Sequence, residues 1–481
     1  MAVSTSIATS SVPALLGAPL CLRHLPPLAR GERGFTRPSC ASSIRSRDMI
    51  RAGIGQTFEA FGVGLFRLHW LLTVMAFMAF SMNFTVLPIV AFDLGGDNSS
   101  VALAMAGNGV DWFFIGPFAG ALTDRLSKRR LIVMAQTAIA INYALIGFLI
   151  LIGRIEVIWL TVSTLFLGAC FAFTGPSRRA YVADIVPPRL VGNGVALLQT
   201  GLTFPQSVGP VLGSLLLFAP FIGADGAYFI MAAILVITIV SLFLMPPGSP
   251  RNVPRGSVVR ELILGLRYAW RQPRLRVLLA TLLLVSATAG PYQNVLPGLL
   301  ENVFGIESRN LGLITWPMGV GSFVVGLSVA GVVGTRWSAG VLLVMSCAFG
   351  LGVALLGVTP NALVMLPVVF LIGSGFSAFQ TLNTAEVIRQ SEREFHGRVT
   401  ALTFLPFGVQ SFTGLGFGQV ADMIGEQDVL IIMGLSAIAI SLVLGTIYLR
   451  MKTPTIEVHE AVERVVRRTL RPVAAVMRPQ K

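Results

Sequence analysis

Apolar runs of about 20 residues recur along the chain from residue 70 to residue 449. A helix rises about 1.5 Å per residue, so such a run crosses the ~30 Å hydrocarbon core of a membrane. The runs are continuous and do not alternate in segments of about ten residues, which excludes a transmembrane β-barrel. The pattern predicts an all-α membrane protein with twelve transmembrane helices, at about 70–92, 99–122, 131–153, 157–179, 190–218, 226–246, 276–298, 310–334, 338–358, 361–385, 399–421 and 428–449.

Basic residues are concentrated in alternate loops between the predicted helices. With the N-terminus inside, the five cytoplasmic loops hold eighteen Lys and Arg residues, whereas the six outer loops hold only Arg154 and Arg309. Because cytoplasmic loops retain positive charge, both termini are predicted to face the cytoplasm.

The composition excludes a soluble protein. Of 481 residues, 54% are hydrophobic and 12% are charged, whereas a soluble domain carries about 25% charged residues. The net charge of +14 is spread over the loops, so no nucleic-acid partner is expected. The chain has no phosphate-binding loop, no nucleophile–base constellation and no metal-ligand spacing among its cysteines and histidines. We therefore expect no enzyme activity, no cofactor and no metal.

Short matches link the two halves of the chain at offsets of about 204 to 211 residues. Val86-Leu87-Pro88 recurs as Val295-Leu296-Pro297, and Gln206-Ser207 recurs as Gln410-Ser411. Internal repeats of this kind are common in transporters. They predict two pseudo-symmetric six-helix halves, with the chain divided into an N-terminal extension (1–64), a first half (65–247), a basic cytoplasmic linker helix (248–275), a second half (276–450) and a basic tail (451–481).

The segment Gly120-Ala-Leu-Thr-Asp124-Arg125-Leu-Ser-Lys128-Arg129-Arg130 follows the second predicted helix. It resembles the loop signature of the major facilitator superfamily, with Ser127 in place of a second glycine. The resemblance covers 65–450 and implies the twelve-helix major facilitator fold. It also implies a gate at the cytoplasmic helix ends, where a carboxylate near a helix terminus is favourable, formed by Gly120, Asp124, Arg125, Arg129, Arg178 and Asp184. Asp422 is expected to act similarly in the second half.

A second stretch is similar to one branch of that superfamily. Pro176-Ser-Arg178-Arg-Ala180, Ile185-Val-Pro187 and Gly209-Pro210-Val-Leu-Gly213 resemble the enterobactin-exporter-like secretion branch, also called the third drug:proton antiporter group or transmembrane secretion effectors. The resemblance implies export of an amphipathic small molecule by alternating access, with proton antiport. Only the last part of the antiporter motif is present, because Pro205 stands where a glycine is expected.

Asp111 is the outstanding ionisable residue inside a predicted helix. It precedes Asp124 by thirteen residues, or about 20 Å along a helix, so it lies near the middle of the second span. Intramembrane carboxyls are costly and are functional candidates by default, and burial raises their pKa. Asp111 is therefore the proton-coupling candidate. The alternative that stays open is a structural role for Asp111, in which its carboxyl is neutral or hydrogen-bonded, for example with Asn108.

Polar side chains in three predicted spans are candidates for a substrate cavity. The resemblance implies that spans one, four, seven and ten line it, and the prolines at 291 and 297 favour a helix break, where transporters bind substrate. The 31 phenylalanines favour an amphipathic or lipophilic substrate. Packing between helices is the alternative role for the candidates Asn83, Thr85, Tyr292, Gln293, Asn294, Gln380 and Asn383.

The two ends and the linker leave alternatives open. Residues 1–48 resemble an organellar transit peptide in composition, but a disordered extension or a true start at Met49 fits as well. The membrane is accordingly the cell (plasma or inner) membrane, or an organelle envelope if the leader is a transit peptide. The linker at 248–275 and the basic tail are expected to bind anionic lipid, and the protein is expected to be a monomer.

Two other functions suit the same pattern. A flippase or importer of a lipid-like substrate would use the same cavity. A membrane assembly factor that has lost transport would keep the fold, although it would not need the gate residues.

Overall fold

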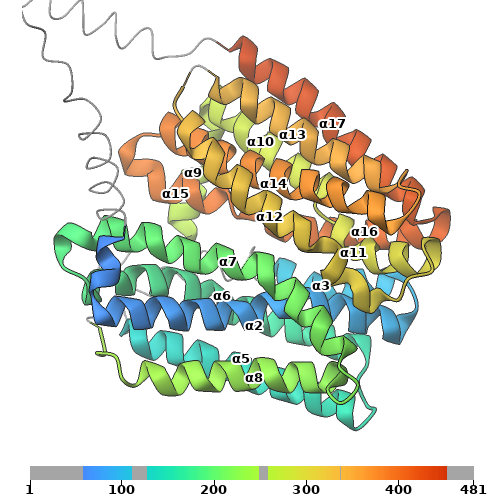
Figure 1. The fold of residues 1–481 in the computed structure, drawn as a ribbon. Helices are drawn as coiled ribbons and strands as arrows, with labels where there is room; N and C mark the ends of the chain where they lie inside the picture. The colour runs from blue at the N-terminus through green and yellow to red at the C-terminus, as the bar shows by residue number, and fades with distance from the viewer. Residues whose placement is uncertain (1–57, 111–126, 249–257, 336, 452–481) are drawn as a thin grey trace, which may run out of the picture. The chain divides into compact units, whose positions relative to one another are not determined.

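The computed structural model describes residues 58–110, 127–248, 258–335 and 337–451 (Figure 1). Within these ranges every regular element is a helix and no strand occurs. The all-α fold class predicted from the apolar runs is confirmed.

In the described part of the first half there are six long helices and two short ones. Their order follows the predicted spans, and a 3-10 turn precedes α2 and another precedes α7. The elements are η1 (Glu59–Gly62), α2 (Gly64–Gly95), α3 (Asn98–Val110), α5 (Lys128–Leu151), α6 (Val157–Ile185), η3 (Pro188–Leu190), α7 (Val191–Phe218) and α8 (Gly223–Leu242).

The second half repeats this order after a linker helix. The linker helix is α9 (Val258–Arg271), which lies within the predicted linker and ends two residues before the next helix begins. The elements that follow are α10 (Pro273–Ala289), α11 (Tyr292–Gly298), the π-helical turn η4 (Leu299–Val303), η5 (Ser308–Asn310), α12 (Leu311–Val329), η6 (Ala330–Val332), α13 (Ser338–Leu356), α14 (Ala362–Gln390), η7 (Arg393–Phe395), α15 (His396–Leu402), α16 (Leu405–Ile424) and α17 (Glu426–Arg450).

Nine helical segments of the described chain are long and apolar enough to cross a membrane. Three predicted spans are not among the nine. The span at 99–122 runs into residues outside the described ranges, and the spans at 310–334 and 399–421 correspond to α12 and to α15 with α16. The helix α16 carries Gln410, Gln419 and Asp422 among its apolar residues, which lowers its mean hydropathy.

Helix packing repeats between the halves. In the first half α5 packs on α8, α3 on α6 and α2 on α8; in the second half α13 packs on α17, α12 on α14 and α10 on α17. The halves meet mainly through two equivalent pairs, α3 with α16 and α7 with α12. The contacts therefore have the pseudo-symmetry that the sequence repeats predict.

Local chemistry explains several helix ends. Gly96 ends α2 in the left-handed conformation, with φ of 73°, which glycine adopts without steric cost. Asn361 caps α14, because its side-chain oxygen accepts hydrogen bonds from the backbone N–H groups of Leu363 and Val364, both at 3.1 Å. Such a cap satisfies donors that a helix N-terminus otherwise leaves free.

The seventh span is interrupted where the two prolines predict a break. The helix α10 ends at Ala289 and α11 begins at Tyr292, with Pro291 between them. The Gln410 side chain of α16 donates a hydrogen bond to the Gly290 carbonyl at the break, at 3.2 Å. The interruption thus has a polar partner inside the bundle, as irregular backbone at membrane depth requires.

Candidate functional site

The two halves are joined by hydrogen bonds at one end of the bundle, which we call the closed end. Asp422 of α16 accepts hydrogen bonds from the backbone N–H groups of Asn98 and Ser99, at 2.8 and 3.0 Å, where α3 begins. The Asn98 side chain also donates to Glu426 at 3.0 Å, and Ser308 donates to Asp93 at 3.1 Å. Among the described residues, the hydrogen bonds between the halves all lie at this end.

Asp422 was expected to belong to a cytoplasmic gate, and that expectation is wrong. Asp422 is near the last residue of α16, and α16 runs from the end where α14 finishes to the end where α3 begins. The carboxylate therefore lies at the closed end, opposite to Asp184.

Glycines allow the two halves to pack closely in the region between the closed end and the middle of the bundle. A Cβ built on Gly312 of α12 would collide with the Pro210 carbonyl oxygen of α7, and one built on Gly319 would collide with the Ser207 backbone. On the other side, a Cβ on Gly109 of α3 would lie 2.8 Å from the Ser411 Cβ of α16. Only glycine allows helices to pack this tightly.

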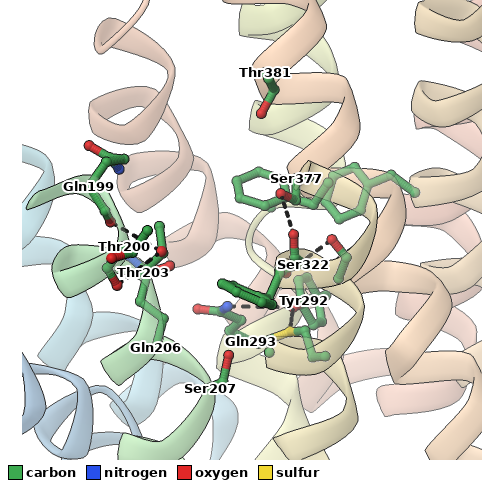
Figure 2. A pocket seen from close by; sticks show the side chains of 18 of the residues that line it. Gln199, Thr200, Thr203, Gln206, Ser207, Tyr292, Gln293, Ser322, Ser377 and Thr381 are labelled. Atoms are coloured by element: carbon green, nitrogen blue, oxygen red, sulfur yellow. Dashed lines mark hydrogen bonds between the residues drawn. The ribbon is translucent and has the colours of Figure 1, made fainter. Parts of the chain in front are cut away.

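Beyond this contact lies a cavity of about 460 Å³ between the halves, which we call the polar cavity. Figure 2 shows the side chains of α7 on one wall and those of α11, α12 and α14 on the other. Gln199 and Thr200 of α7 and Thr381 of α14 are exposed on this lining. The polar side chains that line the cavity are Gln199, Thr200, Thr203, Gln206, Ser207, Tyr292, Gln293, Ser322, Ser377, Thr381 and Gln410.

A second cavity of about 300 Å³, the aromatic cavity, lies next to the first. Phe80 of α2 stacks on Phe171 of α6 with ring centroids 4.3 Å apart. Phe77 and Phe84 contact this pair edge-on, at 5.3 Å from Phe171 and 5.0 Å from Phe80 respectively. Phenyl faces from two helices therefore gather on one wall.

The two cavities share five residues: Gln206, Gln293, Gln410, Met318 and Phe376. The three glutamines come from α7, α11 and α16, and we call them the glutamine junction. Among the described residues that line the two cavities, none is Asp, Glu, Lys, Arg or His. The lining thus offers hydrogen bonds and apolar contacts, without a formal charge.

The opposite end of the bundle is rich in basic residues, and we call it the basic end. Buried Lys128 of α5 forms a salt bridge of 2.9 Å with Asp184 of α6. Arg129 donates to the Met245 carbonyl after α8, and its guanidinium lies 6.0 Å from the Phe243 ring centre. The predicted gate residues Arg129 and Asp184 therefore both lie at this end.

Arg178 is fully buried in α6 and contacts α2. Its guanidinium donates to the Thr73 hydroxyl at 2.7 Å, and its carbonyl is 3.2 Å from the His69 ring nitrogen. The salt bridge of Asp184 is with Lys128. Arg178 thus ties α6 to α2, and Asp184 ties α6 to α5.

The predicted cavity residues fall into two groups. Tyr292 and Gln293 line the polar cavity, and Thr85 lines the aromatic cavity. The remaining four are placed elsewhere. Asn83 lines a small side cavity with Asn108 and Thr164. Asn383 donates to the Leu278 carbonyl at 3.1 Å, and Asn294 packs against Gly414. Gln380 lines neither of the two large cavities within the described chain.

The residues of α7 on the cavity wall were not expected from the sequence. Gln199, Thr203 and Gln206 follow each other at spacings of four and three residues, and Thr200 is seven residues before Ser207. Such spacing places polar groups on one helix face. This polar stripe inside an otherwise apolar span was the signal that could have identified the wall.

Four predicted residues lie outside the described residues: Asp111, Gly120, Asp124 and Arg125. Their roles stay predictions. In the part of the chain that is described, no group of three His, Cys, Asp or Glu side chains could hold a metal ion.

Two six-helix halves with a cavity between them define a multi-pass membrane protein of the secondary transporter class. A family model described as Major Facilitator Superfamily matches residues 70–414, and the chain belongs to that superfamily. The fold and family expected from the loop signature are thereby confirmed.

Individual relatives and structures agree with this family. The chain is 23% identical to the staphyloferrin A transporter of Staphylococcus aureus, over 70% of this chain and 84% of the relative. It is 24% identical to the class C tetracycline resistance protein of Escherichia coli, over 61% of this chain and 73% of the relative. The crystal structure of the nucleoside transporter NupG is similar in fold, with a TM-score of 0.67 and 15% identity over 81% of this chain and all of NupG.

Proposed function

We propose that the protein exports an amphipathic small molecule across its membrane by alternating access, in exchange for protons. The observation that carries this proposal is the cavity between the halves, which inter-half hydrogen bonds close at one end. A transporter must close one end of such a cavity while substrate enters from the other.

The basic end is proposed to face the cytoplasm. Lys128, Arg189, Arg274 and Arg389 all lie there, and cytoplasmic loops of membrane proteins are enriched in such residues. With this orientation both termini are cytoplasmic, and the described arrangement is the state in which an exporter takes up its substrate.

The relatives support export and leave the substrate open. Curated relatives include proteins named for tetracycline resistance, multidrug resistance and quinolone resistance. These names describe those proteins. They favour the removal of a small organic molecule over uptake of a lipid-like one or a purely structural role.

Proton exchange is proposed to use Asp111. The sequence predicts that Asp111 lies near the middle of the second span, and an intramembrane carboxyl is a functional candidate by default. Substrate binding and proton binding would then favour opposite conformations of the same bundle.

A cell assay tests export and the role of Asp111 together. The uncharged dye N-phenyl-1-naphthylamine is added to a host that lacks its own efflux pumps. We expect the protein to lower dye accumulation several-fold, and Asp111→Asn to abolish this effect. Asp225→Asn, which removes a carboxyl in the first turn of α8 outside both cavities, serves as the control and should retain export.

Two results would contradict the proposal in different ways. Equal accumulation with and without the protein, at matched expression, argues against export of lipophilic molecules. Export that survives Asp111→Asn with unchanged pH dependence excludes Asp111 from proton exchange.

A further inference from the structure

The absence of formal charge on the described cavity walls restricts the substrate. Neither the polar nor the aromatic cavity is lined by an acidic or basic side chain in the described ranges. An ion that leaves water for such a site loses its hydration without gaining a counter-charge. Phenyl faces attract a cation, but this attraction recovers only part of the lost hydration.

The aromatic cavity offers phenyl rings to which a planar group can add. The Phe80 and Phe171 rings are nearly parallel, with an interplanar angle of 11°, and Phe376 belongs to both cavities. A planar aromatic group can add to this cluster in offset-stacked or edge-to-face contact, which are the geometries that aromatic pairs prefer.

The glutamine junction offers hydrogen bonds where the two cavities meet. Because the Gln410 amide nitrogen is held by the Gly290 carbonyl, the orientation of this side chain is fixed. Its oxygen is buried and has no partner among the described residues. A buried acceptor without a partner is costly, and a donor group on a substrate would remove that cost.

We propose that the substrate is an uncharged molecule with two parts, a planar aromatic ring that binds against Phe80 and Phe171 and a hydrogen-bond donor, such as an amide or hydroxyl group, that binds Gln410. Gln206 and Gln293 provide further amide groups beside it. The combined cavities, of about 460 and 300 Å³, are of the size that holds a drug-sized molecule. This inference rests on the proposed transport function and specifies its substrate class.

Three probes with the same ring test the inference. Dansylglycinamide is uncharged, dansylglycine carries a carboxylate, and dansylaminoethyl-trimethylammonium carries a fixed positive charge. Binding of each probe to the purified full-length protein is measured by dansyl fluorescence, in a separate titration for each probe. We expect dansylglycinamide to bind at least about tenfold more tightly than either ion, since each ion leaves water for an uncharged site.

Variants of α16 separate the junction from general effects of folding. Gln410→Glu is similar in size, adds a negative charge and loses the hydrogen bond to the Gly290 carbonyl, so it should weaken dansylglycinamide several-fold and strengthen the trimethylammonium probe at least about tenfold. Gln419→Glu changes the same residue type on an exposed face of the same helix and should alter neither affinity. Thermal unfolding of each variant checks that the bundle is intact.

Phe171→Leu should weaken binding of all three probes by a similar factor, because all three share the ring.

The outcomes distinguish the substrate class from the transport function. Equal or tighter binding of the cation to the wild-type protein, or no binding of dansylglycinamide, overturns the inference. Movement of the probes across proteoliposome membranes is then measured separately. If the cation and the neutral probe are moved equally well, export stands and the substrate class is wrong; if the neutral probe binds selectively and no probe is moved, the substrate class stands and export is wrong.

Discussion

Asp422 stabilises the closed end through a helix that belongs to the other half. Its carboxylate accepts from the first two N–H groups of α3, at 2.8 and 3.0 Å, and the N-terminus of a helix carries partial positive charge. These two bonds therefore cap α3. Because Asp422 and α3 belong to different halves, they separate when the halves open at this end. The Asp422 carboxylate is therefore one of the groups that hold the closed end together, beside Glu426 and Asp93.

We expect Asp422→Asn to weaken the closed end. The amide keeps one acceptor oxygen and loses the charge, which in this partly exposed position costs about 1 kcal/mol, or about fivefold in population. In a background without native cysteines, Thr315→Cys reports on opening, because Thr315 is buried beside the aromatic cavity. Labelling by a membrane-impermeant maleimide from the Asp422 side should become several-fold faster.

The control is Asp428→Asn, which removes an exposed carboxyl in the first turn of α17. This change should leave the labelling rate as in the wild-type protein. Equal opening of the bundle by both variants would exclude a capping role for Asp422.

At the scale of elements, α9 has two faces with different neighbours. Tyr268 stacks on Phe395 at 4.1 Å and Gly265 faces Arg398 of α15, so one face is packed on the second half. The apolar side chains of Ile263, Leu266 and Trp270 are 57%, 50% and 67% exposed. Arg260, Arg267 and Arg271 are also exposed on this helix. An exposed apolar stripe with arginines beside it is typical of a helix that lies in the membrane interface.

We expect α9 to prefer anionic lipid. In a single-tryptophan variant that retains Trp270, brominated phosphatidylglycerol should quench fluorescence more strongly than brominated phosphatidylcholine. Each arginine at an anionic surface contributes about 1 kcal/mol. The double change Arg267→Gln and Arg271→Gln should therefore reduce the lipid preference at least about tenfold. A variant that retains only Trp316, which is 44% exposed on α12, should show no preference, and equal quenching at Trp270 by both lipids would exclude the anionic site.

The elements also show what the sequence could predict. The apolar runs, the linker helix and the break between α10 and α11 depend on residues close together in the chain, so their patterns are visible in it. The Gln410–Gly290 bond joins residues 120 positions apart, and the Asn98–Asp422 bond joins residues 324 positions apart. No local pattern records such pairs. Asn383 illustrates the same limit, because its amide donates to the Leu278 carbonyl 105 positions away, and no residue near Asn383 in the sequence indicates that bond.

At the scale of the whole molecule, the halves meet along α7 and α12 on one side and α3 and α16 on the other. Gly312 and Gly319 place the α12 backbone directly against α7. Larger side chains there would force the halves apart at the closed end, while each half kept its own core. Because transport needs both states, a block in one of them should stop turnover without unfolding the protein.

We expect Gly319→Val to reduce transport of a bound probe at least about tenfold while leaving the unfolding temperature within a few degrees. The added side chain would collide with the Ser207 backbone in the described arrangement, in which the closed end is shut. Gly416→Val is the matched control, since a Cβ at Gly416 meets no atom within 4 Å, and it should transport normally. Normal transport by Gly319→Val would show that the halves do not need this close contact.

The uncharged lining of the two cavities has an electrical consequence. If a neutral cargo leaves while one proton enters, as proposed, each cycle moves one elementary charge across the membrane. The voltage then contributes about 2.3 kcal/mol per 100 mV to each cycle. Expulsion would continue with equal pH on both sides, and an electrode would record it as an inward current that stops when the cargo is exhausted.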